Sequence, residues 1–348
     1  MNTATDTLAR WRDTVADVLP RNGLGKLLAF ILGLYLIVVL ILGMYWSIAP
    51  APFNVKEKAQ ALAAAEGGTV VRGSVTMGAL IGVMETLLDK PGGFTHNDRF
   101  PPGVWLDNMP NWEYGVLIQV RDLSRAMREV LSRSQSQSTE DVDLVEMEPR
   151  FNFNSDSWIL PSSESEYRDG LKYARAYFNR LSDTQAPDAQ FYARADNLRY
   201  WLSTVDSRLG SLSQRLSASV GKARFNTDLA GDASATQSTD APLERVVRTE
   251  WMEIDDVFYE ARGTAWALIQ FLKAAEVDFA DVLEKKNATV SLQQIIRELE
   301  GTQEAVWSPM ILNGSGFGVL ANHSLVMASY LSRACVICCR RGNCKEHP

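Results

Sequence analysis

The side chains best suited to chemistry lie in segment 251–272, where the spacing of apolar residues predicts a helix. At about 100° per residue, Asp255, Tyr259, Arg262 and Trp266 fall along the margin of its apolar face. A half-buried carboxylate needs a partner, and Tyr259 could bridge Asp255 to Arg262, about two turns away. We interpret these four residues as a structural polar network or, alternatively, a ligand site.

Three other acids of the same segment lie on the opposite side of the predicted helix. Glu253, Asp256 and Glu260 are offset from the apolar stripe, so we expect them to be solvated. Carboxylates on a solvated face give no evidence of a catalytic pair.

A second candidate is the glycine-rich stretch Gly314, Gly316 and Gly318, which precedes a helix predicted from Val319. Backbone N–H groups at such a place can hold an anion, but the spacing and Lys-Ser/Thr of a phosphate loop are absent. A tight turn is the alternative. We expect His323 to be a hydrogen-bonded helix residue, because no Gly-x-Ser-x-Gly or His-Glu-x-x-His motif accompanies it.

The third candidate is the C-terminal tail, which holds every cysteine of the chain. Cys335, Cys338, Cys339, Cys344 and His347 offer thiolate and imidazole ligands for zinc. Their crowding is atypical, because zinc modules separate two ligand pairs by about a dozen residues. We therefore favour no metal here and predict a reading-frame change near codon 334, which leaves a dispensable, metal-free and disordered tail. Translation of the DNA in its other two frames tests this prediction.

The elements that position these residues begin with an apolar run. No Asp, Glu, Lys or Arg occurs between Lys26 and Lys56. At about 1.5 Å per residue, segment 27–49 is long enough to cross a hydrocarbon core of about 30 Å. The run is longer than the core of a cleaved signal peptide, so we expect a transmembrane helix that contacts the lipid bilayer through residues 27–48.

The charges beside this helix predict its orientation. Arg10, Arg12, Arg21 and Lys26 precede it, whereas only Lys56 and Lys58 follow closely. The positive-inside rule therefore places residues 1–26 in the cytoplasm and the remaining chain in the periplasm of a bacterial inner membrane. Segment 74–88 is too short an apolar run for a second span and predicts a buried helix.

The composition excludes some classes of protein. The chain has 46% hydrophobic and 22% charged residues, which is typical of a globular domain. Acidic residues outnumber basic ones 42 to 35, so we expect no nucleic-acid partner.

Residues 50–333 show the three-and-four spacing of amphipathic helices. The stripes are Val116, Val120, Leu123, Met127 and Val130; Tyr167, Leu171, Ala174, Phe178 and Leu181; Leu198, Leu202, Val205, Leu209, Leu212 and Leu216; Ile254, Phe258, Ala261, Ala265, Leu268 and Leu272; and Leu292, Ile295, Ile296 and Leu299. The third stripe resembles a coiled-coil seam, which we interpret as packing within the bundle, with a helical partner protein as the alternative. The fold class is therefore mainly α.

Polar and proline-rich segments divide these helices. Segments 132–141 and 226–242 are rich in small polar residues and predict mobile loops. Segment 90–110 contains four prolines, so it predicts an irregular loop, with Trp105 and Trp112 as its anchors on the bundle.

Several long strings of the chain are similar to one bacterial family. These are Leu87–Gly93, Trp105–Trp112, Phe191–Leu198, Asp255–Gly263 and Asn313–Gly318. On these strings the chain resembles the domain of unknown function family numbered 2333. The resemblance extends to about Arg333, and residues 334–348 depart from it as an atypical cysteine-rich tail. It implies a membrane-associated protein of a Gram-negative bacterium and carries no activity, cofactor or catalytic residue.

The sequence thus predicts an uncharacterised, membrane-anchored envelope protein with no cofactor and a noncatalytic structural or interaction role. An envelope protein partner could bind through one helical face. The alternative is a hydrolase-like enzyme or ligand-binding protein whose pocket lies between loop 90–112, turn 313–318 and helix 251–272.

Overall fold

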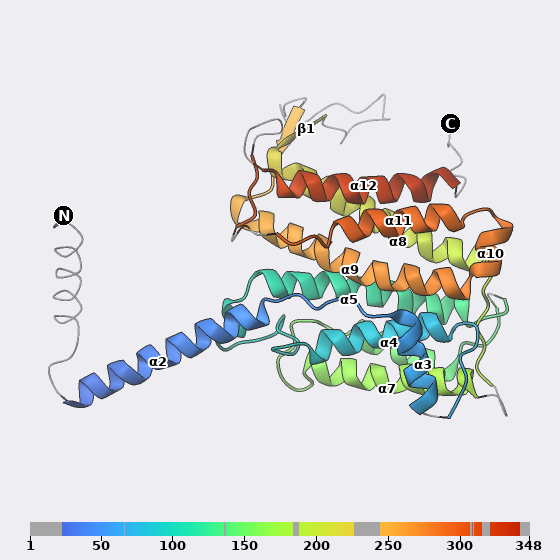
Figure 1. The fold of residues 1–348 in the computed structure, drawn as a ribbon, viewed down its shortest axis with the longest axis horizontal. Helices are drawn as coiled ribbons and strands as arrows, with labels where there is room; N and C mark the ends of the chain where they lie inside the picture. The colour runs from blue at the N-terminus through green and yellow to red at the C-terminus, as the bar shows by residue number, and fades with distance from the viewer. Residues whose placement is uncertain are drawn as a thin grey trace, which may run out of the picture.

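The computed structural model describes residues 23–65, 67–135, 137–183, 188–225, 244–306, 308, 310–314 and 321–341. It is a bundle of helices with one helix, α2, projecting from an end (Figure 1). The α-helices are α2 Gly23–Trp46, α3 Val55–Ala65, α4 Ser74–Asp89, α5 Asn108–Ala126, α6 Val142–Phe151, α7 Ser163–Ser182, α8 Ala195–Ser217, α9 Ile254–Asp278, α10 Ala280–Lys285, α11 Thr289–Gly301 and α12 His323–Arg341. The mainly α prediction is confirmed.

The remaining elements are short. Tighter or wider turns occupy Gly103–Trp105, Met127–Leu131, Ala218–Val220 and Trp251–Glu253. Strands β1 (Lys222–Phe225) and β2 (Glu244–Val247) pair antiparallel, with Lys222 opposite Val247. The sequence pattern did not predict this ribbon. The polar segment 226–242, predicted as a mobile loop, lies outside the described residues.

Helix α2 is long and apolar enough to cross a membrane, and its side chains are almost all exposed. Helix α4 differs because thirteen of its residues are buried, from Ser74 to Leu88. This agrees with the prediction that only the first apolar run is a candidate span.

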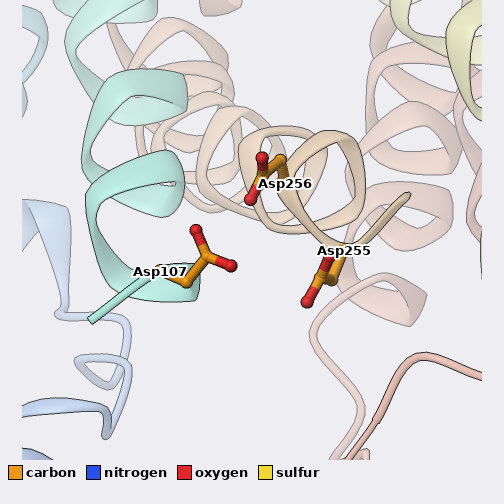
Figure 2. A group of neighbouring side chains, drawn as sticks. All are labelled: Asp107, Asp255 and Asp256. Carbon is orange, nitrogen blue, oxygen red and sulfur yellow. The ribbon is translucent and has the colours of Figure 1, made fainter. Parts of the chain in front are cut away.

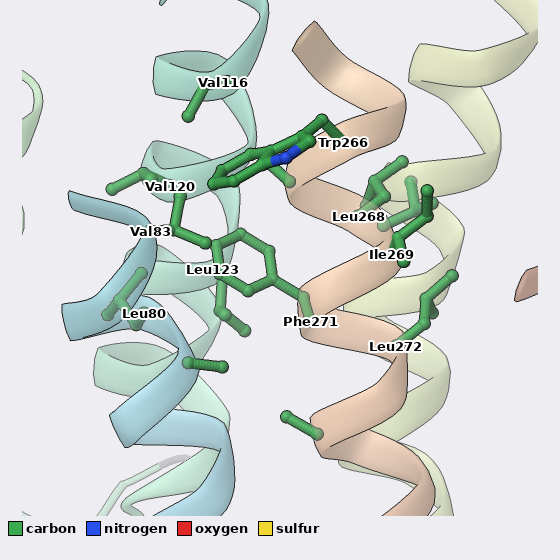
Figure 3. Packing of buried hydrophobic residues seen from close by; sticks show 14 of the residues in the cluster. Leu80, Val83, Val116, Val120, Leu123, Trp266, Leu268, Ile269, Phe271 and Leu272 are labelled. Atoms are coloured by element: carbon green, nitrogen blue, oxygen red, sulfur yellow. The ribbon is translucent and has the colours of Figure 1, made fainter. Parts of the chain in front are cut away.

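The core is one continuous apolar cluster that includes the predicted stripes except Ile254, which is buried outside it. Val116, Val120 and Leu123 of α5 face Phe271 and other residues of α9 (Figure 3). Leu202 and Val130 are only partly buried at the edge of this cluster. Leu209 is fully buried, so the seam of α8 packs within the bundle.

Helices α5 and α9 cross at two glycines. A Cβ built on Gly115 would lie 2.1 Å from the backbone oxygen of Glu260, and one on Gly263 would lie 2.0 Å from that of Trp112. The two backbones therefore touch, which only glycine permits. This crossing fixes the first turns of α5 and α9 side by side.

The link from α2 to the bundle is mostly exposed but is held at its far end by Phe53. Residues 47–54 connect α2 to α3, and Phe53 meets Trp266 with ring centroids 6.3 Å apart. A Cβ on Gly82 would lie 2.7 Å from the Phe53 ring. The connection is thus held against α4 and α9.

Candidate functional site

The first candidate region is the end of the bundle where α2 leaves it. The starts of α5, α7, α9 and α12 and the end of α4 gather there (Figure 1). A Cβ on Gly43 of α2 would lie 3.7 Å from Cβ of Pro102 and 3.8 Å from Cδ2 of Leu106. Trp46 packs on Gly92, whose φ of 88° and missing side chain leave room for the indole. Residues 90–107, which we call the 90–107 loop, therefore contact the end of α2.

A buried ion pair fixes this loop. Lys90 Nζ lies 2.5 Å from Glu113 Oε1, and both side chains are almost completely buried. The same carboxylate accepts hydrogen bonds from Thr95 N and Oγ1 and from His96 N, at 2.8 to 2.9 Å. These donors compensate the cost of removing the charges from water. The loop is therefore irregular in path but firmly held.

Sequence reasoning missed Glu113, although its position carried a signal. Glu113 precedes Val116 and Val120 at the same three-and-four spacing and so extends the apolar stripe of α5. An acid on an apolar face requires a buried partner, and Lys90 is that partner.

The prediction for the two tryptophans is half right. Trp112 is 1% exposed and packs on Trp266 with ring centroids 5.2 Å apart. Trp105 is 55% exposed and does not anchor the loop. It lies in the short turn Gly103–Trp105, and the loop is held instead by the Lys90 ion pair and by Phe94, which is buried edge to face against Tyr167.

A second loop, residues 152–162, is joined to the first. Asn97 Nδ2 donates to Ser157 O at 2.7 Å, and His96 Nε2 lies 3.1 Å from Asp156. Phe100 meets Trp158 edge to face, with centroids 5.7 Å apart. The two loops thus form one unit beside α2.

Asp98 lies within this unit. Burial, followed by the nearby carboxylates of Glu113 and Glu164, raises the pKa of Asp98 from 3.8 to about 6. Lys90 acts in the opposite direction, but its charge is engaged by Glu113.

The second candidate region is a group of three carboxylates. Asp107 at the start of α5 meets Asp255 and Asp256 at the start of α9, with carboxylate oxygens within 4.8 Å of one another (Figure 2). Asn111 Nδ2 donates to Asp256 at 2.7 Å. Burial, then the charge of Asp107 and a hydrogen bond with it, raises the pKa of Asp256 from 3.8 to about 7.

This group can hold a proton at neutral pH, because three negative charges so close together repel one another. It could also contribute ligands to a hard divalent cation, which takes about six to eight oxygens in the case of Ca²⁺. Three carboxylates, one of them exposed, supply only part of such a shell.

The acids expected to be solvated on this segment are mostly engaged. Glu253 is exposed as predicted, whereas Asp256 is half-buried against Asn111. Glu260 is paired with Arg215 at 2.8 Å. The prediction fails for these two because α9 packs against helices on nearly every side, leaving no solvated face there.

The four residues predicted as one network have different surroundings. Asp255 joins the acidic group, and Trp266 packs in the core. Arg262 Nη2 donates to Gln303 O at 3.0 Å, while Gln303 Nε2 donates back to Arg262 O at 3.1 Å. Burial lowers the pKa of Arg262 and raises that of Tyr259, and the charges of Arg262 and Asp255 both act on Tyr259, so these three groups remain electrostatic neighbours as predicted.

The glycine turn is described only at its edges. Asn322 Nδ2 donates to Gly314 O at 3.0 Å, and α12 begins at His323, not Val319. His323 Nδ1 accepts a hydrogen bond from Leu312 N at 2.9 Å, the structural role expected for it. Gly316 and Gly318 lie outside the described residues.

The cysteine tail begins within a helix. Helix α12 includes Cys335, Cys338 and Cys339 and ends at Arg341. This part of the tail is therefore helical, whereas the whole tail was predicted to be disordered. Cys335 packs at the edge of the core, which explains the continuation of the helix. Cys344 and His347 lie outside the described residues.

A pocket was predicted between loop 90–112, turn 313–318 and helix 251–272. In the structure, two of these segments pack directly against each other. Loop 90–112 meets α9 through Asn111 and Asp256 and through the glycine crossing. A cleft of about 940 Å³ lies elsewhere, between residues 52–56 and the end of α9, and includes Lys273, Glu276 and Glu284.

The fold defines a class: a helical-bundle domain behind one apolar N-terminal helix, which its loops contact directly. The chain belongs to a family of uncharacterized proteins conserved in bacteria, DUF2333, whose sequence profile matches residues 21–340. The match extends six residues beyond Ala334, where the change of pattern was predicted. No curated protein and no solved structure matches the sequence.

Proposed function

We propose that this protein is a single-pass protein of a Gram-negative inner membrane whose periplasmic bundle has a noncatalytic structural or interaction role. The observation that carries the proposal is helix α2, whose apolar side chains are at least partly exposed except at Val39 and which contacts the domain near its C-terminal end. An apolar helix of this length left in water would be unfavourable, and a bilayer removes that cost.

The noncatalytic role is supported by the use of the polar groups near α2. Lys90, Glu113 and Asn97 are engaged in contacts that join loops to helices. A protein that holds its domain firmly at a membrane is suited to position or bind other envelope proteins.

Reporter fusions test the topology. An enzyme active only in the periplasm, fused to the C-terminus, should be active in a Gram-negative host, because the basic residues precede α2. Activity of a reporter that works only in the cytoplasm would contradict the proposed orientation. Cross-linking of the intact protein in cells, followed by its purification, should capture an envelope partner.

A ligand-binding or hydrolase-like role is the second candidate, and the acidic group favours it. A carboxyl with a pKa of about 7, as Asp256 has, is in the range of a general acid or base. Titration of the protein with Ca²⁺ or Mg²⁺ should release heat in the parent and not in Asp256→Asn if this role holds. Equal heats in both would remove its support.

A further inference from the structure

The end of the bundle beside α2 exposes several large apolar side chains. We call them the anchor-side patch: Phe100, Val104, Trp105, Trp158, Ile159 and Leu160. Trp251 and Met252, just before α9, are also exposed, and the adjoining residues Asp255 and Asp256 contact Asp107 of the 90–107 loop. Contiguous exposed apolar groups on a soluble domain usually mark an interaction site.

The patch is displayed by a rigid support. The buried pair of Lys90 and Glu113 fixes one loop, and Asn97 hydrogen-bonds the other. Phe100 and Trp158 touch across the two loops. Buried polar contacts thus hold these apolar side chains in positions where they remain exposed to solvent and are not covered by the rest of the chain.

The position of the patch along α2 identifies what covers it. Pro102 and Leu106 of the 90–107 loop touch Gly43, three residues before Trp46. At about 1.5 Å per residue, this contact lies about 4.5 Å nearer the middle of the helix than Trp46. If Trp46 marks the membrane interface, as a terminal aromatic residue does, the 90–107 loop lies at interface depth.

The chemistry of the patch fits the same place. Indole and phenyl rings on exposed loops are the groups that partition into a bilayer interface. The acids Asp98, Asp107 and Asp156 outnumber Arg99, the exposed base beside Phe100, so attraction of basic groups to anionic lipid is not what holds the patch there.

We propose that the anchor-side patch inserts into the interface of the same bilayer that α2 crosses, so that the domain rests on the membrane through its loops. The proposal rests on the proposed function, because it requires α2 to be a transmembrane helix. It adds to the transmembrane helix α2 a second contact with the membrane, which is apolar and independent of anionic lipid.

Lipid-borne quenching of a single fluorescent label tests the contact. In the full-length protein, the four native cysteines are replaced by serine and one cysteine is introduced by Ile159→Cys, Val290→Cys or Ile41→Cys. Each is labelled with nitrobenzoxadiazole in nanodiscs of phosphatidylcholine, with or without a nitroxide at the acyl-chain boundary. Ile159 is 61% exposed in the patch, and Val290 is 73% exposed at the other end of the bundle.

The label at position 159 should be quenched about twofold or more by the nitroxide lipid, as expected for a side chain inserted to about 5–10 Å. The label at position 290 should not be quenched. Addition of Trp105→Ser and Trp158→Ser should reduce the quenching at position 159 with little change in the melting temperature, because both indoles are exposed.

The label at position 41, inside α2, separates the two proposals. Quenching at position 41 without quenching at position 159 would overturn the patch contact and leave the anchor intact. Absence of quenching at position 41 would overturn the membrane anchor and the patch contact together. Equal quenching at positions 159 and 290 would show unspecific immersion and would also overturn the proposal.

Discussion

The glycine crossing of α5 and α9 offers the sharpest test of the fold. In Gly115→Ala, the new Cβ would lie 2.1 Å from Glu260 O and 2.8 Å from Thr264 N. A carbon normally stays about 3.3 Å or more from a carbonyl oxygen, so the two helices must separate by about 1 Å. Backbone atoms cannot rotate away as a side chain can.

The expected change in the free energy of unfolding is the sum of two opposing effects. Alanine favours the helix over glycine by about 1 kcal/mol. Separation of α5 from α9 forfeits a quarter to a half of the dispersion energy of contacts across a gap of about 1 Å, including those of Trp112 with Trp266. Overpacking of this kind costs about 1–3 kcal/mol and more where the backbone is involved, so we expect a net loss of about 3 kcal/mol.

Thermal and urea unfolding of the purified protein, followed by circular dichroism, measures this loss. The matched control is Gly210→Ala in α8, where the new Cβ would lie 3.9 Å from Cys335 Sγ, an ordinary contact. The control should gain up to about 1 kcal/mol from helix propensity. If the Gly115→Ala and Gly263→Ala proteins were as stable as the control, the close crossing would be wrong.

Four further substitutions test other parts of the structure. Lys90→Met should cost about 3–5 kcal/mol in urea unfolding, because it leaves Glu113 buried without its cation; an unchanged midpoint would contradict the buried pair. The raised pKa of Asp256 means that the folded state binds its proton more tightly than the unfolded state, so its contribution to stability is greatest below pH 3.8 and is lost as pH rises to about 7. Asp256→Asn should therefore increase the free energy of unfolding more at about pH 8 than at about pH 5, by about 1 kcal/mol after screening by solvent, and equal gains in urea unfolding at the two pH values would contradict this. Leu209→Asp should cost at least about 3 kcal/mol in thermal unfolding because Leu209 is fully buried, whereas Glu260→Ala should cost about 1 kcal/mol by releasing Arg215; equal losses would misplace the core.

The helices could be predicted from the sequence because their signal is local. The stripe from Leu198 to Leu216 and the apolar run of α2 each need only neighbouring residues to be recognised. Segment 74–88 was separated from a membrane span for the same reason, since its length alone decided the question.

Contacts between distant segments could not be predicted in this way. Asp255 acts on Tyr259 of its own helix, as the spacing suggested, but its neighbours also include Asp107, from a distant part of the chain. Trp105 and Trp112 have the same side chain, and only the path of the backbone between them decides that one is exposed and the other buried. The crossing at Gly115 likewise depends on which two helices meet.

The connection between α2 and α3 is held at both ends, which has a mechanical consequence. Phe53 is held by Gly82 and Trp266, and Trp46 is held by Gly92, so the segment between them has little freedom to swivel. A domain on a slack tether tumbles independently of its anchor. Here the bundle and α2 should turn as one body, so a tilt of the helix in a thicker or thinner bilayer would become a rotation of the whole domain about the membrane surface.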